Sequence, residues 1–209
     1  MSDIKNLLFD FGGVLVDLDK QRCVDEFAKL GIDMSRYIGD YGQSGFLTKL
    51  ERGEVTIAQF CDMLREKTGC NVTDSQIVAA WESFLVGVPH ERLQLILKAK
   101  EHYHIYLLSN TNYIHWHQAK KDYFSYDGHK PEDFFEKIFL SCDMGMEKPD
   151  HAIFKAVVNG IGSDASSIMF FDDSEKNCEA ARQCGLQSVI APQHGEWMKY
   201  FDEEGRLCL

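Results

Sequence analysis

Short apolar runs that end in polar residues recur along the chain. Continuous apolar runs of this length are typical of strands buried on both faces of a parallel sheet. Between them, apolar positions at helical spacing predict helices over 91–101 and 150–159, and a third helix over 174–184 that Asp173 or Ser174 can cap and Gly185 can stop. This alternation predicts an α/β fold with a doubly wound parallel sheet. The predicted strands lie at 6–10, 105–110, 137–143, 167–173 and 187–192.

Residues 17–89 break the alternation, because they carry helix signals and no convincing strand. Thr56 with Gln59, and Thr73 with Gln76, each match a capping box, and apolar positions at helical spacing follow both pairs. We therefore expect a helical cap over 17–89, with a cap loop at 39–45, inserted into an α/β core formed by 1–16 and 90–209. An insertion at this point would lie over the carboxyl ends of the strands, where open α/β sheets bind ligands, and would serve as a lid.

The composition excludes several classes of protein. The chain has 209 residues, 44% hydrophobic and 26% charged, which is typical of a soluble globular protein. Its formal net charge of −11, from 22 Lys and Arg against 33 Asp and Glu, argues against a nucleic-acid partner but is compatible with a small anionic substrate. The seven scattered cysteines include no CxxC pair, which favours a cytoplasmic location. No apolar stretch approaches the roughly 18 residues of a membrane span, so no membrane contact is expected.

Polar residues stand where the predicted strands end, and the carboxyl ends of parallel strands meet at one edge of a sheet. Three carboxylates beside an ammonium and an amide favour a magnesium site with an anion next to it. A carboxylate there can be the nucleophile of a phosphoryl transfer, while a hydroxyl and an ammonium neutralise the phosphoryl oxygens. The residues expected at this edge are Asp10, Ser109, Asn110, Asp172 and Asp173, with Lys148 in a loop after another strand.

Four motifs in this order resemble those of the haloacid dehalogenase-like hydrolases, and they span nearly the whole chain. They are "FDFGGVLVD" from Phe9, "LLSNTN" from Leu107, "GMEKPD" from Gly145 and "FFDDSEKNCEAA" from Phe170. The helical insertion also stands where that family carries a helical cap. The "ERGE" turn of Glu51 to Glu54 and the residues of the second and third motifs are similar to those of bacterial sugar-phosphate phosphatases of the glucose-1-phosphate phosphatase type.

The resemblance implies a phosphoric monoester hydrolase that uses Mg²⁺ and an aspartyl-phosphate intermediate to hydrolyse a small phosphorylated metabolite. Both a monomer and a homodimer stay open as the oligomeric state. The resemblance also implies two catalytic residues, one of which, Lys148, also belongs to the phosphate site. The metal would be held by carboxylates and by one backbone carbonyl, with Asp173 the more direct carboxylate ligand. The catalytic residues are Asp10 and Lys148, the substrate-binding residues Ser109, Asn110 and Lys148, and the metal ligands Asp10, Asp172, Asp173 and the Gly12 carbonyl.

Gly12 departs from the family pattern. Most phosphatases of the family carry a second Asp at this position, which protonates the leaving oxygen and then activates water. A positioned acid or base contributes about 100- to 10,000-fold, so its loss slows the reaction without abolishing it. Three substitutes are open: a cap carboxylate, a water, or an acidic leaving group such as the anomeric hydroxyl of a sugar 1-phosphate. The candidate cap carboxylates are Asp17, Asp19 and Glu54.

Two other functions fit part of the pattern. A haloacid dehalogenase would use Asp10 to attack carbon and would need no acid at position 12. It would also need no metal, so the pair Asp172 and Asp173, which suits a metal site, argues against a dehalogenase. A catalytically weak sensor of phosphorylated ligands would keep the metal site and show negligible turnover. Dependence on a divalent metal separates the first alternative from a phosphatase, and turnover separates the second.

Overall fold

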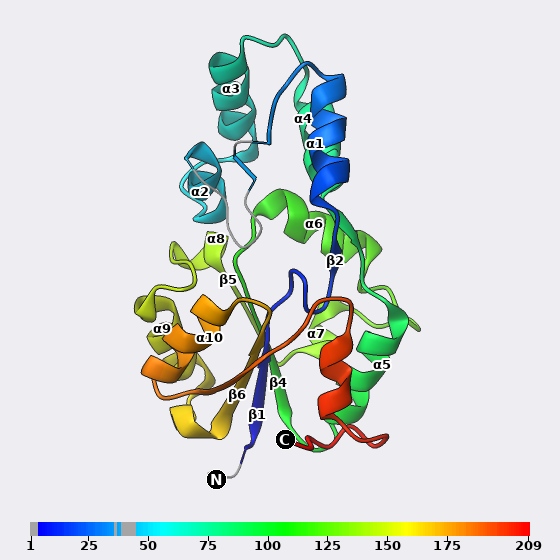
Figure 1. The fold of residues 1–209 in the computed structure, drawn as a ribbon, viewed down its shortest axis with the longest axis vertical. Helices are drawn as coiled ribbons and strands as arrows, with labels where there is room; N and C mark the ends of the chain where they lie inside the picture. The colour runs from blue at the N-terminus through cyan, green and yellow to red at the C-terminus, as the bar shows by residue number, and fades with distance from the viewer. Residues whose placement is uncertain (1–3, 36, 39–44) are drawn as a thin grey trace.

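The computed structural model describes residues 4–35, 37–38 and 45–209, and within them a parallel sheet of five strands has the order β5-β4-β1-β6-β7 (Figure 1). β1 lies in the middle and pairs with β4 on one side and β6 on the other. The predicted doubly wound α/β fold is therefore confirmed. The strands are β1 (Asn6–Phe9), β4 (His104–Ser109), β5 (Lys137–Leu140), β6 (Ile168–Asp172) and β7 (Gln187–Ile190).

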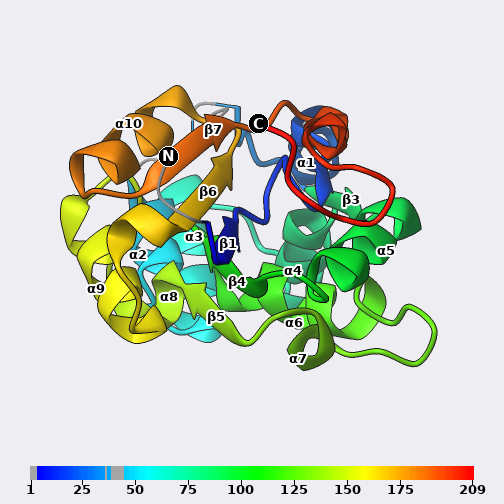
Figure 2. The ribbon, with the colours of Figure 1, turned by 90° about the horizontal axis from the view of Figure 1, so that it is seen from below.

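Helices cover both faces of this sheet, as the view along the strands shows (Figure 2). Alternate residues of a strand point to opposite faces, so Leu8 joins the apolar cluster beneath one helical layer while Leu7 and Phe9 join the other. This two-sided burial explains why the strands read as continuous apolar runs. One layer contains α9 (His151–Ile161) and α10 (Glu175–Gln183), and the other contains α5 (His90–Ala99) and the short 3₁₀ helix η2 (Glu196–Tyr200).

A second group of helices stands above the carboxyl end of the sheet (Figure 1). Both predicted capping boxes are present, with Thr56 accepting from the Gln59 N–H and Thr73 from the Gln76 N–H. The expectation of a strand-free insertion was wrong, because β2 and β3 pair antiparallel at its two ends. Strands of two and three residues are too short for a period-2 pattern to be recognised. The elements are β2 (Asp17–Leu18), α1 (Lys20–Lys29), α2 (Phe46–Glu51), α3 (Ile57–Thr68), α4 (Asp74–Glu82) and β3 (Leu85–Gly87).

Other expectations need smaller corrections. The run at 137–143 ends as a strand at Leu140 and continues as the one-turn helix α8 (Ser141–Met144). Between α6 and β5 the chain also forms the one-turn helix α7 (Pro131–Phe134). The segment after β7 forms only the 3₁₀ turn η2, and a second such turn, η1 (Ala165–Ser167), comes directly before β6. Of the expected cap loop at 39–45, residues 39–44 lie outside the described residues. In the part of the chain described, no helix is both long enough and apolar enough to span a membrane.

Aromatic stacking joins the upper helices to the core helix α6 (Tyr113–Asp122). The buried His115 ring of α6 stacks on Trp81 and Phe84, with centroid distances of 5.1 and 5.6 Å. His115 Nε2 donates to the Trp81 carbonyl oxygen at 3.0 Å, since a carbonyl can only accept. The ring therefore carries its proton on Nε2, and its position ties α6 to α4.

The "ERGE" turn makes a second junction, against α8 and the loop after it. Ser141 Oγ lies 2.6 Å from the Glu51 carbonyl oxygen, and Arg52 pairs with Glu147 at 2.9 Å. Gly53 has a φ of 65°, and a Cβ built on it would lie 2.0 Å from the Cys142 carbonyl oxygen. The motif seen in the sequence is therefore a docking turn in which only glycine allows so close an approach.

Glu51 contributes a buried carboxyl to this junction. The residue is 8% exposed, and its carboxyl has no hydrogen-bond or ion-pair partner among the residues described. Burial raises the pKa of Glu51 to about 8, and the nearby Glu147 carboxylate adds to the rise. The neutral acid is therefore the form that this site accommodates.

We predict that Glu51→Gln stabilises the protein increasingly as the pH rises from about 4.5 to 8. The unfolded chain loses the Glu51 proton near 4.5 while the folded chain keeps it to about 8. The stability that the neutral Glu51 carboxyl contributes is therefore fully present below this window and is lost as the pH rises through it. At about 1.36 kcal/mol per tenfold change in proton affinity, the effect is at most about 5 kcal/mol. Thermal unfolding of both proteins between pH 4.5 and 9 measures it. Glu54→Gln changes an exposed carboxyl of the same turn and is the control. A difference in Tm between Glu51→Gln and wild type that is constant with pH would contradict the prediction.

Candidate active site

Asp10 follows the last residue of β1 and lies between the ends of β4 and β6. Its backbone N–H donates to the Phe171 carbonyl at 2.8 Å, which extends the sheet pairing by one residue. The Phe11 N–H donates to Asp10 Oδ1 at 2.7 Å, and the residue is 7% exposed. One carboxylate oxygen of Asp10 is therefore held in place by the backbone of its own turn.

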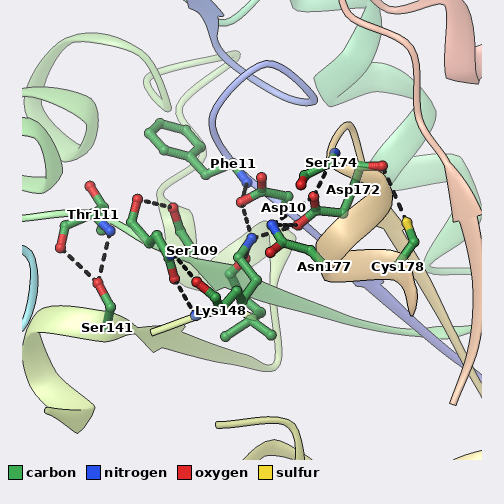
Figure 3. Close-up of polar contacts among 12 residues, drawn as sticks. Asp10, Phe11, Ser109, Thr111, Ser141, Lys148, Asp172, Ser174, Asn177 and Cys178 are labelled. Atoms are coloured by element: carbon green, nitrogen blue, oxygen red, sulfur yellow. Dashed lines mark hydrogen bonds and ion pairs between the residues drawn. The ribbon is translucent and has the colours of Figure 1, made fainter. Parts of the chain in front are cut away.

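Lys148 is the centre of the site (Figure 3). Its ammonium lies 2.7 Å from Asp10 Oδ1 and 2.7 Å from Asp172 Oδ2, and it donates to the Leu108 carbonyl at 3.2 Å. The three acceptors come from the ends of three neighbouring strands, so the three donor protons of the ammonium are all used. With 4% of its surface exposed, Lys148 is a buried cation that joins β1, β4 and β6.

Asp172, the last residue of β6, is fully buried. Its Oδ1 accepts from the Ser174 N–H at 2.8 Å and from Asn177 Nδ2 at 2.9 Å, at the start of α10. Lys148 occupies Oδ2, to which Asn177 Nδ2 is also close, at 3.1 Å. Four polar contacts within the protein thus fix the position of this carboxylate.

Asp173 is held differently, at the edge of the site. Gln193 Nε2 donates to Asp173 Oδ2 at 2.8 Å. Gly13 lies against the same oxygen: its φ is 76°, and a Cβ built there would be 2.4 Å from Oδ2. The Asp173 carboxylate is therefore confined between a glutamine donor and a backbone that leaves no room for a side chain.

The remaining predicted residues lie at the last residue of β4, in the loop that follows it, and in the loop after β1. Ser109 is 1% exposed, and its Oγ lies 3.4 Å from the Asn110 carbonyl oxygen. Both polar atoms of the Asn110 side chain bond to the backbone of Lys148, at 2.8 Å each. Gly12 forms an isolated bridge with Val16. The structure thus brings Ser109, Asn110, Lys148 and the three acids to one end of the sheet.

Two of the three candidate cap carboxylates have other partners. Asp17 Oδ1 accepts from the buried Arg92 at 2.8 Å, and Asp19 Oδ1 accepts from the Arg22 N–H at 2.8 Å as the cap of α1. Glu54 is exposed on the docking turn. Asp17 and Asp19 therefore act as structural acceptors in this arrangement.

Three carboxylates face one ammonium at this site, which leaves two negative charges in excess. Burial raises the pKa of Asp10 well above its ordinary value, Lys148 opposes the rise, and Asp172 and Asp173 add to it. Burial lowers the pKa of Lys148, but Asp10 and Asp172 more than offset this and raise it to about 12. Burial also raises the pKa of Asp173, against the hydrogen bond from Gln193. A bound cation would relieve this crowding of carboxylates.

Several residues of the site were missed by reasoning from the sequence. Asn177 carried a usable signal, because it lies on the first turn of the predicted helix after the acid pair. Ser141 contacts the backbone N–H and carbonyl of Thr111 beside the site at 2.9 and 3.0 Å, and although it stands just before the third motif, no role was predicted for it. Gln193 lies outside the motifs and carried no signal, so only the folded chain reveals its contact.

A parallel α/β sheet with a lysine-bridged acid cluster at its carboxyl edge and a helical insertion above it defines a class of hydrolase folds. The chain belongs to the haloacid dehalogenase-like hydrolase family, whose model matches residues 4–185. This confirms the resemblance that the four motifs indicated.

Three similar proteins extend the comparison. D-ribitol-5-phosphate phosphatase of Bacteroides thetaiotaomicron is 33% identical over 93% of this chain and 95% of its own. A crystal structure of a family enzyme from the same organism, in complex with magnesium and inorganic phosphate, is 44% identical with a TM-score of 0.88, over 95% of this chain and 100% of the other. A 2-haloacid dehalogenase from Pseudomonas syringae is 17% identical with a TM-score of 0.56, over 90% and 86%, and shares the fold alone.

We predict that Gly13→Ala destabilises the protein by about 1–2 kcal/mol from the left-handed backbone alone, and by more where the methyl group displaces Asp173. Gly12→Ala is the matched control, since a Cβ there meets only Leu18 Cδ1, at 3.5 Å. Denaturant unfolding of both variants measures the difference. Equal losses of stability in the two variants would contradict the packing of Gly13 against Asp173.

Proposed function

We propose that this protein is a magnesium-dependent phosphatase of small phosphorylated metabolites, with sugar and sugar-alcohol phosphates as the substrate class. The observation that carries the proposal is the buried Lys148 ammonium, 2.7 Å from both Asp10 and Asp172. The similarity to D-ribitol-5-phosphate phosphatase and to an enzyme crystallised with magnesium and phosphate supports it.

The acid cluster fits a divalent cation. Asp10, Asp172 and Asp173 each offer an oxygen, and these oxygens lie within 4.8 Å of one another. The two excess negative charges match the charge of Mg²⁺, and carboxylate oxygens are ligands that it prefers. These residues would hold the ion, together with the Gly12 backbone carbonyl. When bound, the ion would neutralise charge on the phosphoryl oxygens and on the cluster.

Asp10 is the proposed nucleophile. Its carboxylate oxygen attacks phosphorus, the bond from phosphorus to the substrate oxygen breaks, and the released alkoxide takes a proton. Water then attacks the aspartyl-phosphate, giving inorganic phosphate and the free Asp10 carboxylate. Oδ1 accepts from the Phe11 N–H and from the Lys148 ammonium, and these contacts keep the carboxylate from rotating and so orient the attack.

Lys148, Ser109 and Asn110 form the proposed phosphate site. The ammonium and the Ser109 hydroxyl supply positive charge and a hydrogen-bond donor to the phosphoryl oxygens as charge develops there. Asn110 supports this site through both of its bonds to the Lys148 backbone, which set where the lysine enters the site.

The missing acid at Gly12 restricts how the leaving oxygen receives its proton. Because Asp17 and Asp19 have structural partners, the substitutes that stay open are Glu54 of the docking turn, a water, and an acidic leaving group. The helices of 17–89 form the proposed cap over a core of 1–16 and 90–209, and the docking turn at Glu51–Glu54 closes it against α8. The proposed setting is the cytoplasm, with the chain acting as a monomer or a homodimer.

We predict that Asp10→Asn lowers kcat at least about 1,000-fold for any substrate that the wild type hydrolyses with Mg²⁺, because a carboxamide is a poor nucleophile. A panel with D-ribitol 5-phosphate, α-D-glucose 1-phosphate and phenyl phosphate measures it by phosphate release. Asp25→Asn, an exposed acid on α1, is the matched control. EDTA should stop the reaction.

Other outcomes of this panel separate the alternatives. Hydrolysis that survives Asp10→Asn would refute the nucleophile. Halide release from a 2-haloacid that EDTA spares would indicate a dehalogenase. Phosphate and Mg²⁺ binding without turnover of any substrate would indicate a sensor. A preference for the anomeric phosphate would support an acidic leaving group, and a preference for the ribitol ester would favour water.

We predict that Gly12→Asp accelerates hydrolysis of alkyl phosphates by at least about 10-fold, since a positioned acid is worth about 100- to 10,000-fold. The backbone admits the change, because a Cβ at this position meets only Leu18 Cδ1, at 3.5 Å. Gly12→Asn has the same size and no proton to give, and is the control. The gain should be smaller for phenyl phosphate, whose leaving group needs less help. Equal rates for the Asp and Asn variants would contradict the prediction.

A further inference from the structure

The chain beyond β7 returns to the site, in a segment that lies past the residues matched by the family model. In Figure 1 it crosses from the side of α10 to the loop that follows β1. Trp197 is fully buried against Phe9, with ring centroids 5.1 Å apart, and its Nε1 donates to the Val14 carbonyl at 2.9 Å. This segment is therefore attached to the same loop that carries Gly12 and Gly13.

Arg92 of α5 fixes that loop from its other side. Its guanidinium donates to the Leu15 carbonyl at 2.9 Å and to Asp17 at 2.8 Å, and the residue is 2% exposed. Buried donors with satisfied partners hold a loop in one conformation. The backbone on which Asp173 packs is thus fixed by Arg92 and Trp197 together.

Within this segment, Gln193 makes a direct contact with an acid of the site. Its Nε2 lies 2.8 Å from Asp173 Oδ2, the oxygen that also packs against Gly13. The contact limits rotation of the carboxylate about its last side-chain bond, which leaves the other oxygen in a defined direction. Asp172 is oriented by four contacts, whereas Gln193 is the side chain that orients Asp173 in the described structure.

We propose that Gln193 is a positioning residue that orients Asp173 for binding of the divalent cation. This inference rests on the metal site of the proposed function. Hydrogen bonds to a ligating carboxylate from outside the metal shell set its orientation, and removing them typically costs about 10- to 100-fold in metal affinity. A neutral amide suits the task, because it donates to the carboxylate without adding a positive charge that would compete with the cation.

The test compares Gln193→Leu with wild type by isothermal titration of Mg²⁺ into the substrate-free protein. The dissociation constant for Mg²⁺ should rise about 10- to 100-fold. The Mg²⁺ concentration that gives half-maximal activity should rise in parallel, while kcat at saturating Mg²⁺ changes less. The rise of Tm that saturating Mg²⁺ produces in wild type should be smaller in the variant at the same concentration.

Gln183→Leu is the matched control, because Gln183 donates to the exposed Glu179 at 3.0 Å on α10, outside the acid cluster. Gln193→Ala provides a second variant without the larger apolar side chain. Unchanged Mg²⁺ affinity in both Gln193 variants, or an equal loss in Gln183→Leu, would overturn the role of Gln193 and leave the proposed function standing. A wild-type protein that binds no Mg²⁺ would overturn both.

Discussion

The site depends on one buried ammonium placed between two carboxylates. Lys148 is 2.7 Å from Asp10 and from Asp172, and these acids end two adjacent strands. Oxygens of the two acids lie within 4.8 Å of each other, and like charges this close repel strongly in a buried environment. The lysine between the two carboxylates therefore holds them close together. Removing the ammonium would leave buried carboxylates without a counter-charge, which is among the more costly changes a protein core can undergo.

The helical insertion is joined to this edge through contacts of two different kinds. At α6 the junction is aromatic and fully packed around His115, whereas at α8 it is polar and depends on the backbone of the docking turn. Ser141 has a single hydroxyl proton and two carbonyl acceptors, Glu51 of the turn and Thr111 of the loop after β4. If the turn lifts, that proton still has an acceptor in the core.

The departure at Gly12 has little effect on the rest of this arrangement. Asp10, Asp172 and Asp173 keep their positions through Lys148, Asn177 and Gln193, none of which involves position 12. Gly13, the neighbouring glycine, is the one that the packing requires, because Asp173 occupies the space of its missing side chain. The two adjacent glycines therefore differ: Gly12 bears on proton transfer in the proposed mechanism, whereas Gly13 bears on the position of an acid.

The sequence alone determined the α/β order, the position of the insertion and the residues at the strand ends. These features are local: apolar runs, capping boxes such as Thr56 with Gln59, and acids directly after strands are all visible along the chain. The tertiary structure decided which contacts join them. It engaged Asn110 with the Lys148 backbone, gave Asp17 to Arg92, and brought Gln193 back to Asp173 from beyond the last strand. No local pattern specifies these pairs, because hydrogen bonds between residues distant in sequence depend on how the elements pack and on nothing that the neighbouring residues encode.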